Sequence, residues 1–180
     1  MKRAAAALAV CALAGCGGSS PSGVAPTTYV RSVCTALGDW SRSIKAAGAE
    51  LQRAATGTAS LAKGKQQYQT FIGELLTDTG RAADALKSAG VPAVKNGKAT
   101  SDALVKAFVQ AKAGLSRAAQ AAAGIPTTSA AAYQAAASGV TNSIRQTLGQ
   151  MAAVQPQKDP QLHAAASKEK TCQALTSSTS

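Results

Sequence analysis

A chain of 180 residues, 46% of them hydrophobic, is long enough to bury one core and to form one domain. Only 3% of the residues are aromatic and alanine supplies much of the hydrophobic content, so the core must consist of small side chains that bury less apolar area per residue than leucine does. Nineteen Lys and Arg against eight Asp and Glu give a net charge of +11. Such an excess is typical of proteins that meet nucleic acid, an anionic membrane or an acidic polymer, and the export signal described next argues against nucleic acid.

The first fifteen residues are predicted to be a secretory signal peptide. Met1-Lys2-Arg3 is a short positive segment, and residues 4–13 form an unbroken apolar run that is too short to span a bilayer as a helix. The run closes with Leu13-Ala14-Gly15-Cys16, in which two small residues precede a cysteine. This tetrapeptide resembles the lipobox of bacterial lipoproteins. The resemblance implies that a diacylglyceryl group is attached to the Cys16 thiol and that the chain is cleaved just before Cys16, which places the protein at the cell membrane, on its extracytoplasmic face.

Residues 16–26 are predicted to be the lipidated cysteine and a flexible tether. The segment after Cys16 reads GGSSPSGVAP and has no hydrophobic periodicity, which indicates a linker with a reach of about 15–20 Å. Together with the alanine-rich composition and the lipobox, this tether resembles the small surface lipoproteins of high-GC actinobacteria, and the resemblance implies no particular activity. The domain organisation expected is a signal peptide at 1–15, a tether at 16–26, a helical domain at 27–175 and a polar, disordered tail at 176–180.

Residues 28–55 are predicted to form the helix around which the domain is organised. Two series of apolar residues recur every seven positions and are offset by three, which puts them on one narrow stripe along a helix. A stripe of this kind packs against other helices. The two series are Val30, Leu37, Ile44 and Leu51, and Val33, Trp40, Ala47 and Ala54.

Three further long helices and a short fifth helix are expected after residue 59. Glycine followed by proline should end the second and third helices at residues 90–92 and 124–126, and Pro156 should end the fourth. No segment alternates with period two, so no sheet is expected. The predicted fold is all-α, an up-down-up-down four-helix bundle with a short C-terminal fifth helix that ends near Leu175. The capping residues that predict the helix starts are Ser60, Thr100 or Ser101, residues 127–129 and Asp159-Pro160.

Two cysteines remain outside the cytoplasm if Cys16 is lipidated, because Cys11 lies inside the apolar run and is removed with it. Two thiols in an oxidising compartment usually form one structural disulfide, so Cys34 and Cys172 are predicted to be linked. A metal site would require more ligands. The disulfide would close most of the chain into one loop, which chain-entropy reasoning values at up to about 5 kcal/mol of stability.

Residues that could carry catalysis are few. His163 is the only histidine and is expected to be solvated, and the eight acidic residues are scattered. Glu74 and Asp78 lie four apart on one helical face, a spacing expected of a solvated face rather than a cation site. No glycine-rich phosphate loop or nucleophile motif is present in the sequence. We therefore expect no enzymatic activity, no cofactor and no metal, and a non-catalytic binding or structural role at the cell envelope.

The aromatic residues leave a second function open. They fall on or near the apolar stripes, which predicts that they belong to the core. An alanine-rich bundle also leaves room between its helices, so the alternative is a small-molecule or lipid-binding module whose pocket Trp40 and the tyrosines would line. The aromatic residues concerned are Trp40, Tyr68, Phe71, Phe108 and Tyr133.

Basic residues are predicted to gather at the end of the bundle where the tether enters. In an up-down-up-down arrangement the connection between the second and third helices returns to that end. These residues could meet anionic headgroups or an acidic wall polymer, or they could simply keep the connections soluble, and no protein partner is indicated. The residues concerned are Arg31, Lys87, Lys95, Lys98 and Lys158.

Overall fold

The computed structural model describes residues 23–56, 60–152 and 159–177. These residues are helical apart from turns and one isolated β-bridge between Val24 and Pro92, and no strand is present within them, which confirms the predicted all-α class. The helices are α1 (Pro26–Thr56), α2 (Leu61–Ser88), α3 (Gly97–Ala123), α4 (Ala130–Ala152), α5 (Pro160–Lys168) and α6 (Lys170–Ser177).

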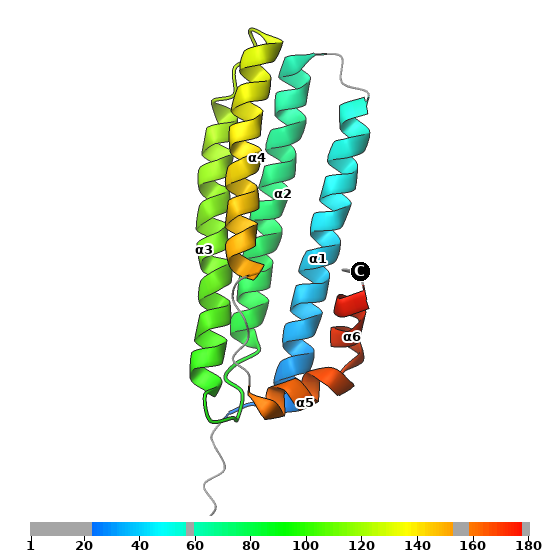
Figure 1. The fold of residues 1–180 in the computed structure, drawn as a ribbon, viewed down its shortest axis with the longest axis vertical. Helices are drawn as coiled ribbons and strands as arrows, with labels where there is room; N and C mark the ends of the chain where they lie inside the picture. Colours follow the sequence, from blue (N-terminus) through cyan, green and yellow to red (C-terminus); the bar gives the residue numbers. More distant parts are fainter. Residues whose placement is uncertain (1–22, 57–59, 153–158, 178–180) are drawn as a thin grey trace, which may run out of the picture.

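The four long helices lie along the long axis of the molecule (Figure 1). In the described ranges α1 packs on α2, α2 on α3 and α3 on α4. The short helix α5 lies across one end, and α6 turns back along α1, so that both short helices pack on α1. We call this end the lower end: α1 and α3 begin there and α2 ends there, as the bottom of Figure 1 shows.

The structure corrects three predicted boundaries. The predicted fifth helix is two helices, because Glu169 has an extended backbone (φ −87°, ψ 117°) between α5 and α6. Helix α6 continues to Ser177, so the predicted disordered tail at 176–180 begins inside a helix. The predicted tether at 16–26 is also too long, since Val24 is held in the β-bridge and Pro26 already belongs to α1.

The start of α3 was also predicted too late. This helix begins at Gly97 rather than at Thr100 or Ser101. A Cβ atom at Gly97 would lie 1.9 Å from the carbonyl oxygen of Pro92, so only glycine fits there. Thr100 and Ser101 are instead buried within the helix.

The core consists of small and branched side chains in three neighbouring clusters. Val30 and Ala47 of the predicted α1 stripe are buried, and Ile44, Leu37 and Trp40 pack against the clusters from the side. The cluster at the lower end joins α1 to the α2–α3 connection and to α5 and α6. It contains Tyr29, Val30, Ala89, Val94, Leu162, Ala165 and Cys172.

Candidate functional site

The N-terminal segment joins the helical domain at the lower end. The backbone N–H of Val24 donates to the Val91 carbonyl oxygen at 2.8 Å, and the N–H of Ala93 donates to the Val24 carbonyl oxygen at 2.8 Å. A Cβ atom at Gly23 would lie 2.7 Å from the Val91 oxygen, so the two backbones approach closely. These contacts fix the point from which the preceding residues leave the domain, directly beside the α2–α3 connection.

The α2–α3 connection is tightly built. Gly90 has φ +78°, a conformation that favours glycine, and its carbonyl oxygen accepts a hydrogen bond from Ser101 Oγ at 2.8 Å. The N–H of Val94 donates to the Pro92 oxygen at 2.8 Å, and that of Gly97 to the Val94 oxygen at 3.0 Å. Pro92 and Val94 are buried. The backbone of the connection is therefore fixed by hydrogen bonds to the N-terminal segment on one side and to α3 on the other, so its exposed side chains cannot turn into the core.

Four of the five basic residues predicted to gather lie at this end, and they differ in whether they form an ion pair. Arg31 Nε donates to Glu169 Oε2 at 3.1 Å, and Lys98 Nζ lies 2.5 Å from Asp102 Oδ2. Lys87 and Lys95 are exposed and form no ion pair with any residue of the described ranges. The fifth residue, Lys158, lies outside the described residues. The lysine charges that remain available from the predicted set are therefore those of Lys87 and Lys95.

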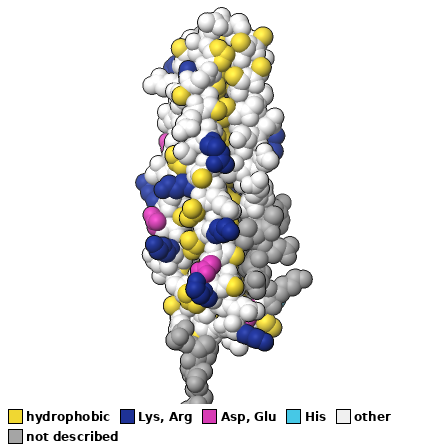
Figure 2. Space-filling model, turned by 90° about the vertical axis from the view of Figure 1, so that its left-hand side faces the viewer, with side chains coloured by type: hydrophobic (Ala, Val, Ile, Leu, Met, Phe, Trp, Pro, Cys, Tyr) yellow, Lys and Arg dark blue, Asp and Glu magenta, His cyan; other side chains and the backbone are white. Residues whose placement is uncertain are grey.

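Basic side chains are not confined to the lower end. Figure 2 shows Lys and Arg side chains along the α3 side of the molecule, with few acidic groups and a narrow line of hydrophobic atoms between them. Charge alone therefore does not distinguish the lower end from this side. The exposed basic residues of α3 are Lys98, Lys106, Lys112 and Arg117.

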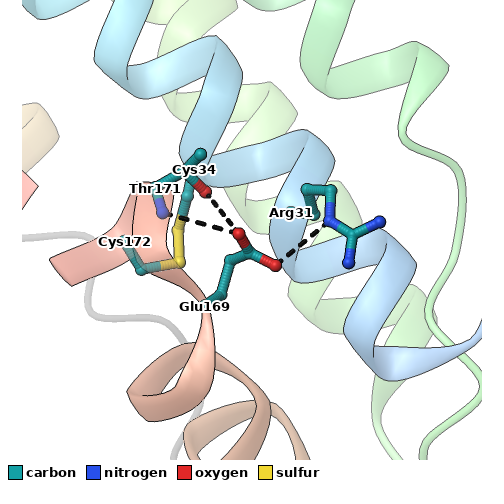
Figure 3. Close-up of polar contacts among 5 residues, drawn as sticks. All are labelled: Arg31, Cys34, Glu169, Thr171 and Cys172. Carbon is teal, nitrogen blue, oxygen red and sulfur yellow. Dashed lines mark hydrogen bonds and ion pairs between the residues drawn. A yellow bond between two sulfur atoms is a disulfide. The ribbon is translucent and has the colours of Figure 1, made fainter. Parts of the chain in front are cut away.

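A disulfide and a hydrogen-bonded, partly exposed carboxylate fasten the C-terminal helices to α1. Cys34 and Cys172, the pair expected from the cysteine count, are joined by an S–S bond of 2.00 Å with their Cα atoms 5.1 Å apart. Figure 3 shows Glu169 beside this bond, facing Arg31 and Thr171. Its Oε1 accepts hydrogen bonds from the N–H of Thr171 at 3.5 Å and from Thr171 Oγ1 at 3.2 Å, which caps the first turn of α6.

Glu169 was not among the predicted site residues. The hydrogen bond from Arg31 is the largest cause of its pKa lying below the usual value of a glutamate; the hydrogen bonds from Thr171 lower the pKa further, while desolvation of the carboxylate opposes them and raises it. The local signal is weak, since glutamate is not among the residues preferred at a helix N-cap. The partner Arg31 lies 138 residues away and carries no such signal.

Two of the predicted aromatic residues form side-chain hydrogen bonds within the protein. Trp40 Nε1 donates to Thr79 Oγ1 at 3.1 Å, and the Trp40 ring meets Phe108 edge-on with centroids 5.2 Å apart. The Tyr68 hydroxyl pairs with Thr141 Oγ1 at 2.8 Å; burial raises its pKa, and this hydrogen bond partly offsets the rise. The polar atoms of Trp40 and Tyr68 thus have partners within the protein, but of the five predicted aromatic residues only Phe108 is fully buried, and the other four pack against the core from partly exposed positions.

An open groove runs between α1 and α2. It comprises a hollow of about 710 Å³ and a smaller one of about 330 Å³ that share residues Ala47, Glu50, Thr70 and Glu74. Phe71 lines the smaller hollow, but Trp40, Tyr68 and Tyr133 line neither. Asp78, predicted to share a solvated face with Glu74, is paired with Arg81 at 2.8 Å. The groove therefore differs in lining from the aromatic pocket that the alternative function requires.

His163 is exposed on α5. The ranges 23–56, 60–152 and 159–177 contain no group of three or more His, Cys, Asp or Glu arranged to hold a metal ion. No helix in the described part of the chain is both long and apolar enough to traverse a bilayer. Cys16 and the predicted signal peptide lie outside the described residues.

Comparison with known proteins returned no matching protein-family profile, no matching curated protein and no matching solved structure.

Proposed function

We propose that this protein is a lipid-anchored, extracytoplasmic helical protein with a non-catalytic binding or structural role at the cell envelope. The observation that carries the proposal is the sequence Leu13-Ala14-Gly15-Cys16 directly after a positive segment and an apolar run. A diacylglyceryl group on Cys16 would hold the lower end close to the membrane, since the chain from Cys16 to Gly23 spans at most about 25 Å when fully extended.

The proposed architecture is an up-down-up-down four-helix bundle to which α5 and α6 are added. The sequential packing of α1 on α2, α2 on α3 and α3 on α4 supports it, as do the short connections between these helices. The disulfide between Cys34 and Cys172 fits an exported protein, because such bonds persist in oxidising compartments.

The test is the fractionation of Cys16→Ala in the native host. Without the Cys16 thiol the lipid has no attachment point, so the variant should leave the membrane fraction for the medium or accumulate as the unprocessed precursor. Cys11→Ala, five positions earlier inside the apolar run, is the matched control and should fractionate as the wild type does. If Cys16→Ala is processed normally and stays with the membranes, the proposed anchor is wrong.

A further inference from the structure

An apolar side chain is held in solvent at the lower end. Val91 and Val109 are the large hydrophobic residues that stand exposed in the described ranges, with 37% and 54% of their surface accessible. Val91 lies between Gly90 and the buried Pro92, and its carbonyl oxygen is bonded to Val24. Because the α2–α3 connection is fixed on both sides, Val91 has no route into the core.

Two available positive charges flank Val91 in the sequence. Lys87 is in the last turn of α2 and Lys95 is in the same connection as Val91, and both are exposed. Neither forms an ion pair with another described residue, whereas Arg31 and Lys98 at the same end are already paired. Membrane interfaces bind surfaces of this composition, because exposed apolar groups can enter the headgroup boundary and nearby lysines are attracted to anionic lipid.

The chain places this group where a membrane would lie. Val24 is hydrogen-bonded to Val91 and Ala93, so the segment that leads back to Cys16 departs next to Val91. We propose that the α2–α3 connection is a membrane contact, in which Val91 enters the headgroup region of an anionic bilayer while Lys87 and Lys95 bind its headgroups. This inference rests on the proposed lipid anchor. A bilayer is favoured over a soluble acidic polymer because only the bilayer offers an apolar phase to Val91.

The experiment uses the mature lipidated protein reconstituted into vesicles of phosphatidylglycerol and phosphatidylcholine. Val91→Cys and Val109→Cys each introduce a thiol for a fluorophore, since Cys34 and Cys172 are oxidised and Cys16 carries the lipid. Val109 is the matched control, because it is exposed and lies about 18 Å along α3 from Gly97. Lipids with a nitroxide on the headgroup should strongly quench the label at residue 91 and barely quench the label at residue 109.

The charges are tested in the same labelled protein. Lys87→Glu with Lys95→Glu should remove most of the quenching at residue 91, as should vesicles of phosphatidylcholine alone or raised salt. Lys63→Glu with Lys65→Glu, near the opposite end of α2, should leave the quenching unchanged. Unchanged melting curves for all variants exclude misfolding as the cause.

The outcomes separate the two proposals. If the protein floats with the vesicles but both labels are quenched equally, or neither is, the membrane contact is wrong and the anchor stands. If the mass of the mature protein purified from the native host shows no lipid on Cys16, the anchor is wrong and the contact falls with it. If residue 91 is not quenched and polyphosphate instead protects Lys87 and Lys95 from acylation, the partner is an acidic polymer and the bilayer contact is overturned.

Discussion

At the scale of single residues, Glu169 determines how the chain ends. Its carboxylate accepts hydrogen bonds from Arg31 and from Thr171, while its own backbone is extended and separates α5 from α6. A continuous helix through residue 169 would carry the chain away from Arg31 rather than back along α1. The position of α6 is therefore held both by the contacts of this acidic side chain and by the Cys34–Cys172 disulfide.

The low pKa of Glu169 predicts a dependence of stability on pH. Because the folded pKa lies below the unfolded value, chiefly through the hydrogen bond from Arg31, the carboxylate stabilises the fold above the unfolded pKa. This stabilisation is lost as the pH falls through the folded pKa. The urea midpoint of Glu169→Gln should therefore lie below that of the wild type at pH 7, and the gap should narrow at pH 3.

The control for this prediction is Glu50→Gln. Glu50 is paired with Arg53 within one exposed helical turn, at 2.6 Å, and such pairs contribute little to stability. The urea midpoint of Glu50→Gln should match that of the wild type at both pH values. A gap for Glu169→Gln that is the same at pH 3 and at pH 7 would contradict the assigned role of the carboxylate.

At the scale of helices, the contact between α3 and α4 depends on a glycine. A Cβ atom at Gly114 would lie 2.6 Å from both Cγ2 and Oγ1 of Thr147, and Thr147 Oγ1 already donates to the Ser143 carbonyl oxygen. The β-branched threonine has little freedom to move aside. The Thr147 side chain therefore occupies the space that a side chain at residue 114 would need, and α4 packs directly on the α3 backbone there.

Gly114→Val should push α4 away from α3. We expect the free energy of unfolding to fall by about 1–3 kcal/mol, the usual cost of overpacking, as measured by urea denaturation. Gly139→Val on α4 is the matched control, because a Cβ atom at Gly139 meets nothing within 4 Å. The control should be as stable as the wild type or slightly more stable, because valine has a higher helix propensity than glycine. Equal losses for the two variants would show that the contact with Thr147 is not the cause.

The sequence predicted the helices better than the places where they end or dock. Period-seven apolar residues and the local cap at Ser60, whose side chain accepts from the Lys63 N–H, are signals within a few residues, and the structure bears them out. The early start of α3 depends on Gly97 fitting against Pro92, and the break at Glu169 depends on Arg31. Both are contacts made through the folded chain, which periodicity does not encode.

The candidate site, too, could be predicted from the sequence only in part. Helix direction was enough to predict that Lys87, Lys95 and Lys98 share one end, because Lys87 is near the end of α2, Lys98 is near the start of α3 and Lys95 is in the connection between them. Which of them is already paired depends on side-chain geometry, as the Lys98–Asp102 pair shows. The exposure of Val91 follows from the backbone hydrogen bonds between the α2–α3 connection and Val24, and the residue pattern does not predict it.

At the scale of the whole molecule, the disulfide links the first helix to the last. Cys34→Ser with Cys172→Ser should lower the melting temperature, because the unfolded chain regains the freedom of a loop of 138 residues, worth up to about 5 kcal/mol. Since α5 and α6 pack on α1 in the described ranges, their amides should lose protection from hydrogen exchange before those of α2 and α3. Equal melting temperatures for the variant and the oxidised wild type would contradict this prediction.

The same bond has a consequence for survival in the presence of proteases. A single peptide cleavage between residues 35 and 171 yields an N-terminal and a C-terminal fragment. The Cys34–Cys172 disulfide keeps the two fragments covalently joined. A cleaved molecule therefore releases nothing into the medium and migrates as one species until a reductant is added. If the proposed anchor on Cys16 holds, release of the domain requires a cut on the N-terminal side of Cys34, and the short stretch between Cys16 and the Val24 bridge is the part of the chain where such a cut would separate the domain from that anchor.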